Sequence, residues 1–268
     1  MFTRLRYLYR ACRYRWHVDP AELRFVVDSL QPGQVAADIG CHKGAYTYWM
    51  RRSVGPSGAV FAFEPQPRQI AYLRDAFSAM RYDNVEIVPM AVSDHCGEMP
   101  LYVPANSGRT HEASLELSVG NRNDIGRPNG VVPENGTVQH IAPTYGTLPV
   151  AVTTLDDFFA GRSSLGPNFV KIDVEGHELA VLHGARRTLA RYRPAILVEC
   201  EARHRPDHNV RPVFDFLESL GYTGTFFLNR ERRPLAEFDP EVHQRLDLTN
   251  PGWLPREYVN NFAFEPTS

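Results

Sequence analysis

Short apolar runs alternate with segments of helical periodicity along most of the sequence, and this alternation leaves few possible folds. Strands separated by helices form a parallel sheet with right-handed connections, and helices cover both faces of such a sheet. The sequence therefore predicts one doubly wound α/β domain with a mostly parallel sheet. Its predicted strands are 35–40, 59–65, 85–93, 169–176, 195–201, 222–228 and 259–265.

The chain of 268 residues is long enough for this one domain and two additions. We expect an N-terminal helical segment at 1–31, followed by the α/β domain at 32–268. Residues 104–150 interrupt the pattern with many Pro, Gly and Asn residues, and they are too numerous for an ordinary connection. We interpret them as an insertion or lid. The predicted helices of the domain and of the segment before it are 20–30, 45–52, 66–78, 178–192 and 213–220.

The first 19 residues are strongly basic, with five arginines against Asp19. Their apolar residues recur at spacings of three and four, which predicts an amphipathic helix. This helix either contacts a membrane surface or an anionic substrate, or it packs its apolar face against its own domain. Asp19 followed by Pro20 predicts an N-cap for the next helix. The apolar positions of the first helix are Phe2, Leu5, Tyr9, Cys12 and Trp16.

Composition excludes several classes of protein. The sequence contains neither the long apolar run of a membrane span nor a signal peptide, so we expect a soluble cytoplasmic protein. Its four cysteines form no CxxC pair, which argues against a structural zinc site and a disulfide framework. A formal net charge of -2 makes nucleic acid an improbable partner. The oligomeric state is not predicted.

The glycine loop after the first predicted strand is the first candidate ligand site. It begins at Asp38 and continues through Gly40, His42, Lys43 and Gly44. In an open α/β sheet, ligands bind at the carboxyl ends of the strands, where glycines let a ligand approach the backbone. The loop lacks the third glycine of a dinucleotide fingerprint, and Asp38 would repel a pyrophosphate. The carboxylate suits the cationic end of a ligand, such as an amino group.

A second carboxylate, Glu64, ends the second predicted strand. Dinucleotide folds carry an acidic residue at this position, where it accepts hydrogen bonds from both ribose hydroxyls. Together with the glycine loop, Glu64 predicts a ligand that contains adenosine. We expect the adenine to lie beside the end of the third strand, at Ala91, Val92, Ser93 and Asp94.

Two acidic loops without a phosphate-binding loop resemble class I methyltransferases that use S-adenosylmethionine (SAM). A narrower resemblance, over about 35–201, is to the FkbM methyltransferase family. It rests on the sequences TTLDDF at 153–158, KIDVEGHE at 171–178, VLHGA at 181–185, PAILVECE at 194–201 and Ser114-Leu115. The resemblance implies a seven-stranded Rossmann-like sheet whose last strand is antiparallel. It also implies SAM-dependent O-methyl transfer to a hydroxyl of a sugar, glycan or secondary metabolite.

The KIDVEGHE sequence carries the candidate catalytic residues. Alternation along an extended segment directs Lys171, Asp173 and Glu175 to one side, and a buried parallel strand contains charges only where they have partners or a function. Methyl transfer to an alcohol needs alignment of the hydroxyl and a base that takes its proton. We expect His177 to be this base, because imidazole titrates near neutral pH. Asp173 is the alternative, as base or as the group that orients the hydroxyl.

Other readings of the same residues stay open. Asp173, Glu199 and Glu201 end neighbouring predicted strands and offer oxygen ligands for Mg²⁺, a metal that we regard as possible but less favoured. A nicotinamide-dependent oxidoreductase is disfavoured by Asp38 and by the incomplete fingerprint. A third reading is a non-catalytic domain that docks to a membrane or a partner protein through its basic N-terminal helix.

Lysine is rare in this chain. Of the 29 basic residues, only Lys43 and Lys171 are lysines, and both fall inside the two candidate motifs. An ammonium group is compact and rotatable, whereas a guanidinium is planar. We therefore expect a specific need for lysine at both positions.

Overall fold

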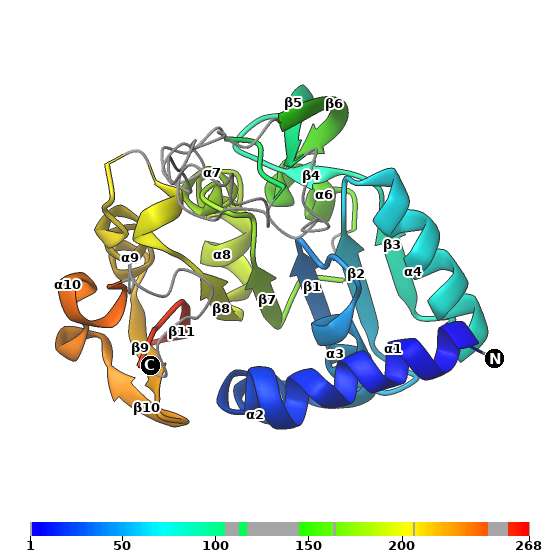
Figure 1. Cartoon of the computed structure of the whole chain (residues 1–268), viewed down its shortest axis with the longest axis horizontal. Helices are drawn as coiled ribbons and strands as arrows, with labels where there is room; N and C mark the ends of the chain where they lie inside the picture. The colour runs from blue at the N-terminus through cyan, green and yellow to red at the C-terminus, as the bar shows by residue number, and fades with distance from the viewer. Residues whose placement is uncertain are drawn as a thin grey trace, which may run out of the picture.

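The computed structural model describes residues 2–104, 113–116, 145–162, 165–205, 207–245 and 257–267. Each helix that periodicity predicts has a counterpart at about its predicted position, and further short helices accompany them (Figure 1). They are α1 (Phe2–Arg13), the π-helix η1 (Tyr14–Val18), α2 (Pro20–Ser29), α3 (Ala45–Val54), α4 (Pro67–Met80), α6 (Leu155–Ala160), α7 (Glu178–His183), α8 (Arg186–Tyr192), η3 (Ala202–His204), α9 (Arg211–Ser219), η4 (Leu235–Glu237) and α10 (Pro240–His243). The strands are β1 (Val35–Ile39), β2 (Ala59–Phe63), β3 (Val85–Val88), β4 (Ala91–Val92), β5 (Gly97–Pro104), β6 (Tyr145–Thr153), β7 (Phe169–Ile172), β8 (Ala195–Glu199), β9 (Tyr222–Leu228), β10 (Glu231–Pro234) and β11 (Asn261–Pro266).

The central sheet has the order β10-β9-β11-β8-β7-β1-β2-β3. Strands β8, β7, β1, β2 and β3 are parallel, whereas β11 is antiparallel to both of its neighbours. This confirms the predicted α/β class and the antiparallel last strand. Within the described residues, the sheet has eight strands rather than seven, because β10 turns back along β9 as a short, exposed edge strand.

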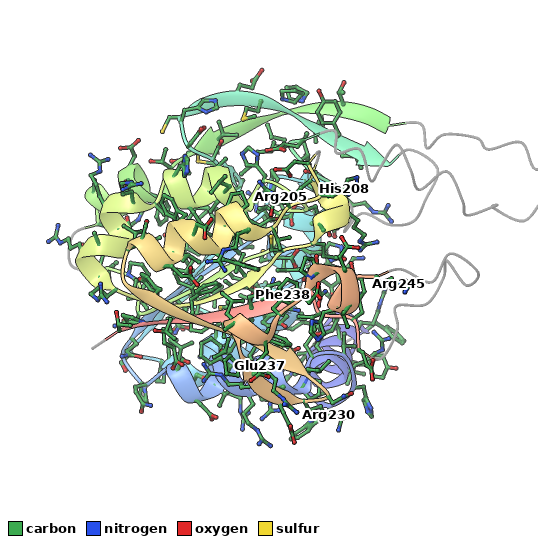
Figure 2. The ribbon with its side chains drawn as sticks, turned by 90° about the vertical axis from the view of Figure 1, so that its left-hand side faces the viewer. Arg205, His208, Arg230, Glu237, Phe238 and Arg245 are labelled. Carbon is green, nitrogen blue, oxygen red and sulfur yellow. The ribbon has the colours of Figure 1, made fainter. Side chains whose placement is uncertain are left out.

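Helices cover both faces of the sheet and bury its apolar residues. Helices α2 and α3 pack on one face, and α1 and α4 extend this layer toward β3. Helices α6, α7, α8 and α9 cover the opposite face, where the larger core cluster lies. Figure 2 shows the layers edge-on, with the yellow and green helices above the sheet and the blue helices below it. Removal of both faces from water supplies the main driving force for this fold.

Two predicted elements are split in the structure. The strand expected at 85–93 ends at Val88, because Pro89 has no N–H for the ladder, and β4 then joins a different sheet. The helix expected at 178–192 breaks between α7 and α8 at Gly184. A Cβ on Gly184 would lie 2.0 Å from the carbonyl oxygen of Ser93, so the break lets the chain pass close to β4.

A second, three-stranded sheet has the order β4-β6-β5 and lies beyond the carboxyl ends of β1 and β2 (Figure 1). Strands β5 and β6 are antiparallel and border the predicted insertion at 104–150. Most of that insertion, at 105–112 and 117–144, lies outside the described residues.

Helix α1 packs against its own domain, but not through the face that the sequence suggests. Tyr7 and Ala11 are buried, and the indole N–H of Trp49 donates to the carbonyl of Ala11 at 2.9 Å. The predicted apolar face of α1 is exposed instead. None of the described helices is long and apolar enough to cross a membrane.

Candidate functional site

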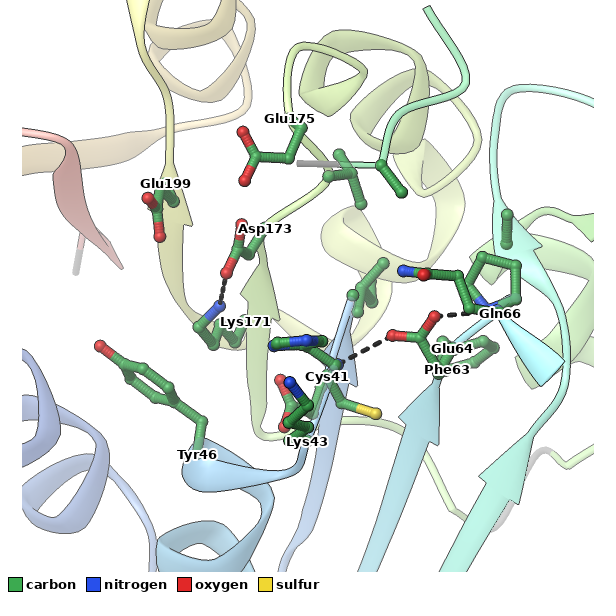
Figure 3. A pocket seen from close by; sticks show the side chains of 18 of the residues that line it. Cys41, Lys43, Tyr46, Phe63, Glu64, Gln66, Lys171, Asp173, Glu175 and Glu199 are labelled. Carbon is green, nitrogen blue, oxygen red and sulfur yellow. Dashed lines mark hydrogen bonds and ion pairs between the residues drawn. The ribbon is translucent and has the colours of Figure 1, made fainter. Parts of the chain in front are cut away.

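A cavity of about 420 Å³ lies at the carboxyl ends of β1, β2 and β7 (Figure 3). The chain runs outward from β1 through β2 to β3, and it later returns to the other side of β1 as β7 and β8. The strand order therefore reverses between β1 and β7, which is where open α/β sheets bind ligands. The cavity thus occupies the position that the sequence predicts for the site.

The loop after β1 forms the floor of the cavity. Gly40 has a φ of +76°, and a Cβ there would lie 1.8 Å from the carbonyl oxygen of Asp173. Glycine is thus required at position 40 by the close approach of the chain after β7. His42 and Lys43 follow in the cavity lining, whereas Gly44 packs behind the loop against Tyr7.

Glu64 lies at the end of β2 and is almost fully buried. Its two carboxylate oxygens accept hydrogen bonds from the amides of His42 and Gln66, each at 2.9 Å (Figure 3). Burial raises the pKa of Glu64 to about 7, against the opposing effect of these two amides. A carboxylate accepts about four hydrogen bonds, so it can still accept two more from a ligand in the cavity.

Asp38 is the penultimate residue of β1 and is fully buried. Thr47 of α3 donates to one of its oxygens at 2.5 Å, and the other oxygen has no hydrogen-bond partner. Burial raises the pKa of Asp38, while Lys171 on the neighbouring strand opposes that effect. An unpartnered buried carboxylate oxygen in a cavity wall is a strong acceptor for a cationic or hydrogen-bonding ligand.

Lys171 is buried beside Asp38, its register partner across β1 and β7. Its ammonium donates to Asp173 at 2.9 Å and lies 4.7 Å from the centroid of the Tyr46 ring (Figure 3). Burial lowers the pKa of Lys171, but the carboxylates of Asp173, Asp38 and Glu199 outweigh it and raise the pKa above the ordinary value. Lys171 is therefore a fixed positive charge at neutral pH.

Two further carboxylates line the cavity near Asp173. Glu175 has a φ of +53° and pairs with Nδ1 of His204 at 2.9 Å. Burial lowers the pKa of His204, but Glu175 raises it to about 9 overall. Glu199 accepts a hydrogen bond from Asn260 at 2.8 Å, and burial and then Asp173 raise its pKa well above the ordinary range.

His177, the expected base, does not line the cavity. It is buried at the N-terminus of α7, where Nε2 lies 2.9 Å from the hydroxyl of Ser93 and Nδ1 lies 2.9 Å from Glu116. Both ring nitrogens thus have partners within the protein. Among the residues expected beside the adenine, Ala91 and Val92 line the cavity, whereas Ser93 binds His177 and Asp94 is exposed.

The carboxylates considered for Mg²⁺ do not converge. Glu201 does not line the cavity. Its carboxylate accepts two hydrogen bonds from Arg203 and one from the hydroxyl of Tyr258. Within the described ranges, no group of three or more His, Cys, Asp or Glu side chains is arranged to hold a metal ion. The structure therefore gives no support to a metal at Asp173, Glu199 and Glu201.

The N-terminal segment supplies one wall of the cavity, and contact of its basic helix with an anionic substrate was one of the alternatives that the sequence left open. Arg10, Tyr14 and Asp19 line it, and the hydroxyl of Tyr46 donates to Asp19 at 3.0 Å. Burial raises the pKa of Asp19 to about 6. Asp19 precedes α2 as predicted, but its side chain makes no capping hydrogen bond. The sequence predicted Asp19 only as an N-cap and not as part of the cavity lining.

The cavity is predominantly acidic. Among the described residues, six with a carboxyl group line it, against three with an ammonium or guanidinium group, Arg10, Lys43 and Lys171. Such a lining favours a ligand with a positive charge. The buried acceptors at Asp38 and Glu64 and the apolar side chains of Ala91 and Val92 therefore fit SAM, which has a sulfonium, an amino group, a ribose and an adenine.

Comparisons with known proteins identify the family of this chain. A family model described as the methyltransferase FkbM domain matches residues 38–223. The 2-O-methyltransferase NoeI of Sinorhizobium fredii is 28% identical over 173 residues, covering 63% of this chain and 65% of NoeI. The hexuronic acid methyltransferase AglP of Haloferax volcanii is 28% identical over 167 residues, covering 62% of this chain and 56% of AglP. The matched region thus spans less than two thirds of either relative.

Among solved structures, an FkbM methyltransferase from Methylobacillus flagellatus aligns with 98% of this chain and 54% of its own. The TM-score is 0.48 and the sequence identity is 13%.

Proposed function

Because the chain belongs to the FkbM methyltransferase family, we propose that it transfers the methyl group of SAM to a hydroxyl oxygen of a sugar or glycan. The observation that carries this proposal is the acidic cavity at the β1–β7 switch point, with Asp38 and Glu64 buried in its wall. Bound SAM supplies an electrophilic methyl group next to a positively charged sulfur. The protein must then bind the cofactor, align the acceptor oxygen and remove its proton.

The cofactor contacts follow from the chemistry of the lining. Glu64 would accept hydrogen bonds from the ribose hydroxyls through the lone pairs that His42 and Gln66 leave available. The free oxygen of Asp38 would attract the positively charged part of SAM. Ala91 and Val92 would hold the adenine, and the glycine loop from Gly40 to Lys43 would hold the methionine part.

Asp173 is our candidate for the general base. It lies in the cavity, and Lys171 fixes one of its oxygens by a hydrogen bond of 2.9 Å, which leaves the other oxygen for the acceptor hydroxyl. General-base catalysis of this kind contributes about 10²- to 10⁴-fold. His177 is less suitable because Ser93 and Glu116 occupy both of its nitrogens outside the cavity lining.

A sugar is supported as acceptor by the polar lining around Asp173. Glu175, Glu199 and Asp19 offer carboxylate oxygens to sugar hydroxyls, and Tyr14 offers an aromatic face to the C–H groups of a sugar ring. The two relatives, a 2-O-methyltransferase and a hexuronic acid methyltransferase, support this class of acceptor. Arg10 at the same wall suits an acidic sugar.

Calorimetry and mass spectrometry test the proposal together. We expect the purified protein to bind SAM but not NAD, and to transfer a labelled methyl group to candidate glycans, including uronic acid glycans. The position of the label in the product identifies the hydroxyl. Binding of NAD in place of SAM would refute the proposed cofactor, and SAM binding with transfer only to carboxylates would refute the proposed acceptor group.

A further inference from the structure

One face of the N-terminal segment carries large apolar side chains that lie in solvent. The exposed fraction is 82% for Phe2, 55% for Leu5, 71% for Tyr9 and 58% for Trp16. These four are more than half of the exposed large apolar residues in the described ranges. Their spacing places them along one side of the segment, away from the buried Tyr7. Apolar patches of this kind mark interaction surfaces.

The charged side chains at the start of this segment are all basic. Residues 1–18 contain no Asp or Glu, and Arg4, Arg6 and Arg13 are exposed. None of these three arginines forms an ion pair with another residue that the structure describes. A second copy of this face would bring arginines against arginines, so the charge opposes self-association. A partner with an anionic surface and an apolar interior would match both the arginines and the exposed apolar side chains.

A basic groove of about 540 Å³ continues this surface beyond Trp16, which lines it. The groove lies between α2 and the β9–β10 hairpin and contains Arg15, Arg24, Arg230 and Arg232. Helices α1 and α2 and strand β10 all lie along the lower edge of the molecule in Figure 1, and Arg230 lies at the lower edge in Figure 2. The acidic residues of the groove are Asp28 and Glu265, of which Glu265 pairs with Arg232 at 2.6 Å.

We propose that this face of α1 and η1, made of Phe2, Leu5, Tyr9 and Trp16 with Arg6 and Arg13 beside them, binds the surface of an anionic phospholipid bilayer. Tyr and Trp favour the interface between headgroups and acyl chains, where an apolar body and a polar tip are both accommodated. Arginine contacts the lipid phosphates, and each basic residue near an anionic surface adds to the attraction. The contact is peripheral, with the segment lying in the plane of the membrane.

Co-sedimentation of the full-length chain with lipid vesicles tests the proposal. We expect binding to vesicles of phosphatidylcholine mixed with phosphatidylglycerol, weak binding to phosphatidylcholine alone, and release as the salt concentration rises. Arg6→Glu/Arg13→Glu and Leu5→Ser/Tyr9→Ser should each lower the partition coefficient by about tenfold or more. The two variants separate the charge from the apolar contribution.

Matched controls carry the same changes on other surfaces. Val242→Ser removes an exposed apolar side chain, and Arg186→Glu/Arg191→Glu reverses two exposed charges. These controls should bind vesicles as the wild type does, and circular dichroism with thermal unfolding verifies that every variant is folded.

Three results would overturn the proposal. The first is wild-type protein that stays in the supernatant with anionic vesicles. The second is equal binding by the wild type and the α1 variants. The third is a dimer in light scattering that the α1 variants dissociate, since the face would then be a contact between two copies. SAM binding and methyl transfer do not enter this test, so its failure leaves the proposed function untouched.

Discussion

Replacing Glu64 by glutamine tests whether the buried carboxyl group lowers the stability of the protein at high pH while it strengthens the binding of SAM. Burial raises the pKa of this carboxyl from 4.5 to about 7. A difference of that size corresponds to about 3 kcal/mol. The native protein keeps the proton up to about pH 7, whereas the unfolded chain loses it near pH 4.5. The folded state therefore binds more protons in this window, and the contribution of Glu64 to the unfolding free energy falls as the pH rises through it.

The Glu64→Gln variant cannot ionise, so this pH-dependent contribution disappears. The backbone N–H groups of His42 and Gln66 donate to the two oxygens of Glu64 at 2.9 Å. In the variant, the NH₂ group of glutamine replaces one of these oxygens, so one backbone N–H faces another donor. An unsatisfied buried donor costs about 1–3 kcal/mol. We expect the variant to be less stable than the wild type near about pH 5 and at least as stable near about pH 8, because the difference changes by about 3 kcal/mol between them.

Urea unfolding of both proteins across this pH range measures the difference directly, with Glu98→Gln as the control for an exposed glutamate. Glu22 and Glu178 also have raised pKa values, but both proteins contain them, so their contributions to the pH dependence cancel in the difference. Calorimetry at about pH 8, where Glu64 is ionised, should show SAM bound about tenfold more weakly by Glu64→Gln, because an ionised acceptor for the ribose is lost. A stability difference that does not vary with pH would refute the reasoning.

Four more outcomes follow from the site. Asp173→Asn should lower the turnover by about 10²- to 10⁴-fold and leave the affinity for SAM nearly unchanged in calorimetry, and unaltered turnover would exclude Asp173 as base. Lys171→Arg should lower turnover by about tenfold or more in a labelled-methyl assay, since a planar guanidinium lacks room in this buried position, and full activity would contradict this. His177→Gln should lower the free energy of unfolding by about 1–3 kcal/mol by disturbing the bond to Ser93, whereas a large loss of turnover at unchanged stability would restore His177 as base. Treatment with EDTA should leave activity intact, and loss that Mg²⁺ reverses would show a metal requirement that the described residues do not reveal.

The pattern of strands and helices was predictable because both faces of the sheet are buried. Continuous apolar runs such as β1 and β7 have few alternatives in a chain with helices between them. The sequence could not show that Pro89 would send β4 into a second sheet, because the partner strand β6 lies far along the chain. Nor could it show β10, since its four residues are all exposed and carry no apolar alternation.

The site was predictable where it depends on strand ends and less so where it depends on side-chain direction. Asp38, Glu64 and Asp173 all follow from the rule that parallel strands present their carboxyl ends to one edge. His177 comes only four residues after Asp173, yet its turn at the start of α7 directs the ring toward Ser93 and away from the cavity. Such a turn depends on tertiary contacts that no local pattern records.

The sequence left open, for a related reason, whether the apolar face of the N-terminal segment packs on the domain or contacts a membrane or a substrate. Periodicity identifies a stripe of apolar residues, but it does not say which side of the helix meets the domain. Here the buried side is set by Tyr7, which packs against Tyr48, Phe77 and Tyr82 of the neighbouring layer. The stripe that looked like a core face is therefore left in solvent.

The rarity of lysine means different things at its two positions. Lys171 is nearly inaccessible and has carboxylates on several sides and the Tyr46 ring against it, so a small ammonium with three rotatable donors meets all of them. Arginine would displace the ring or a carboxylate, and this steric reason explains lysine in a chain that otherwise uses arginine. Lys43 lies half-exposed at the cavity, where burial and the nearby arginines, Arg10 foremost, lower its pKa. Because space is available there, the packing that excludes arginine at 171 does not exclude it at 43.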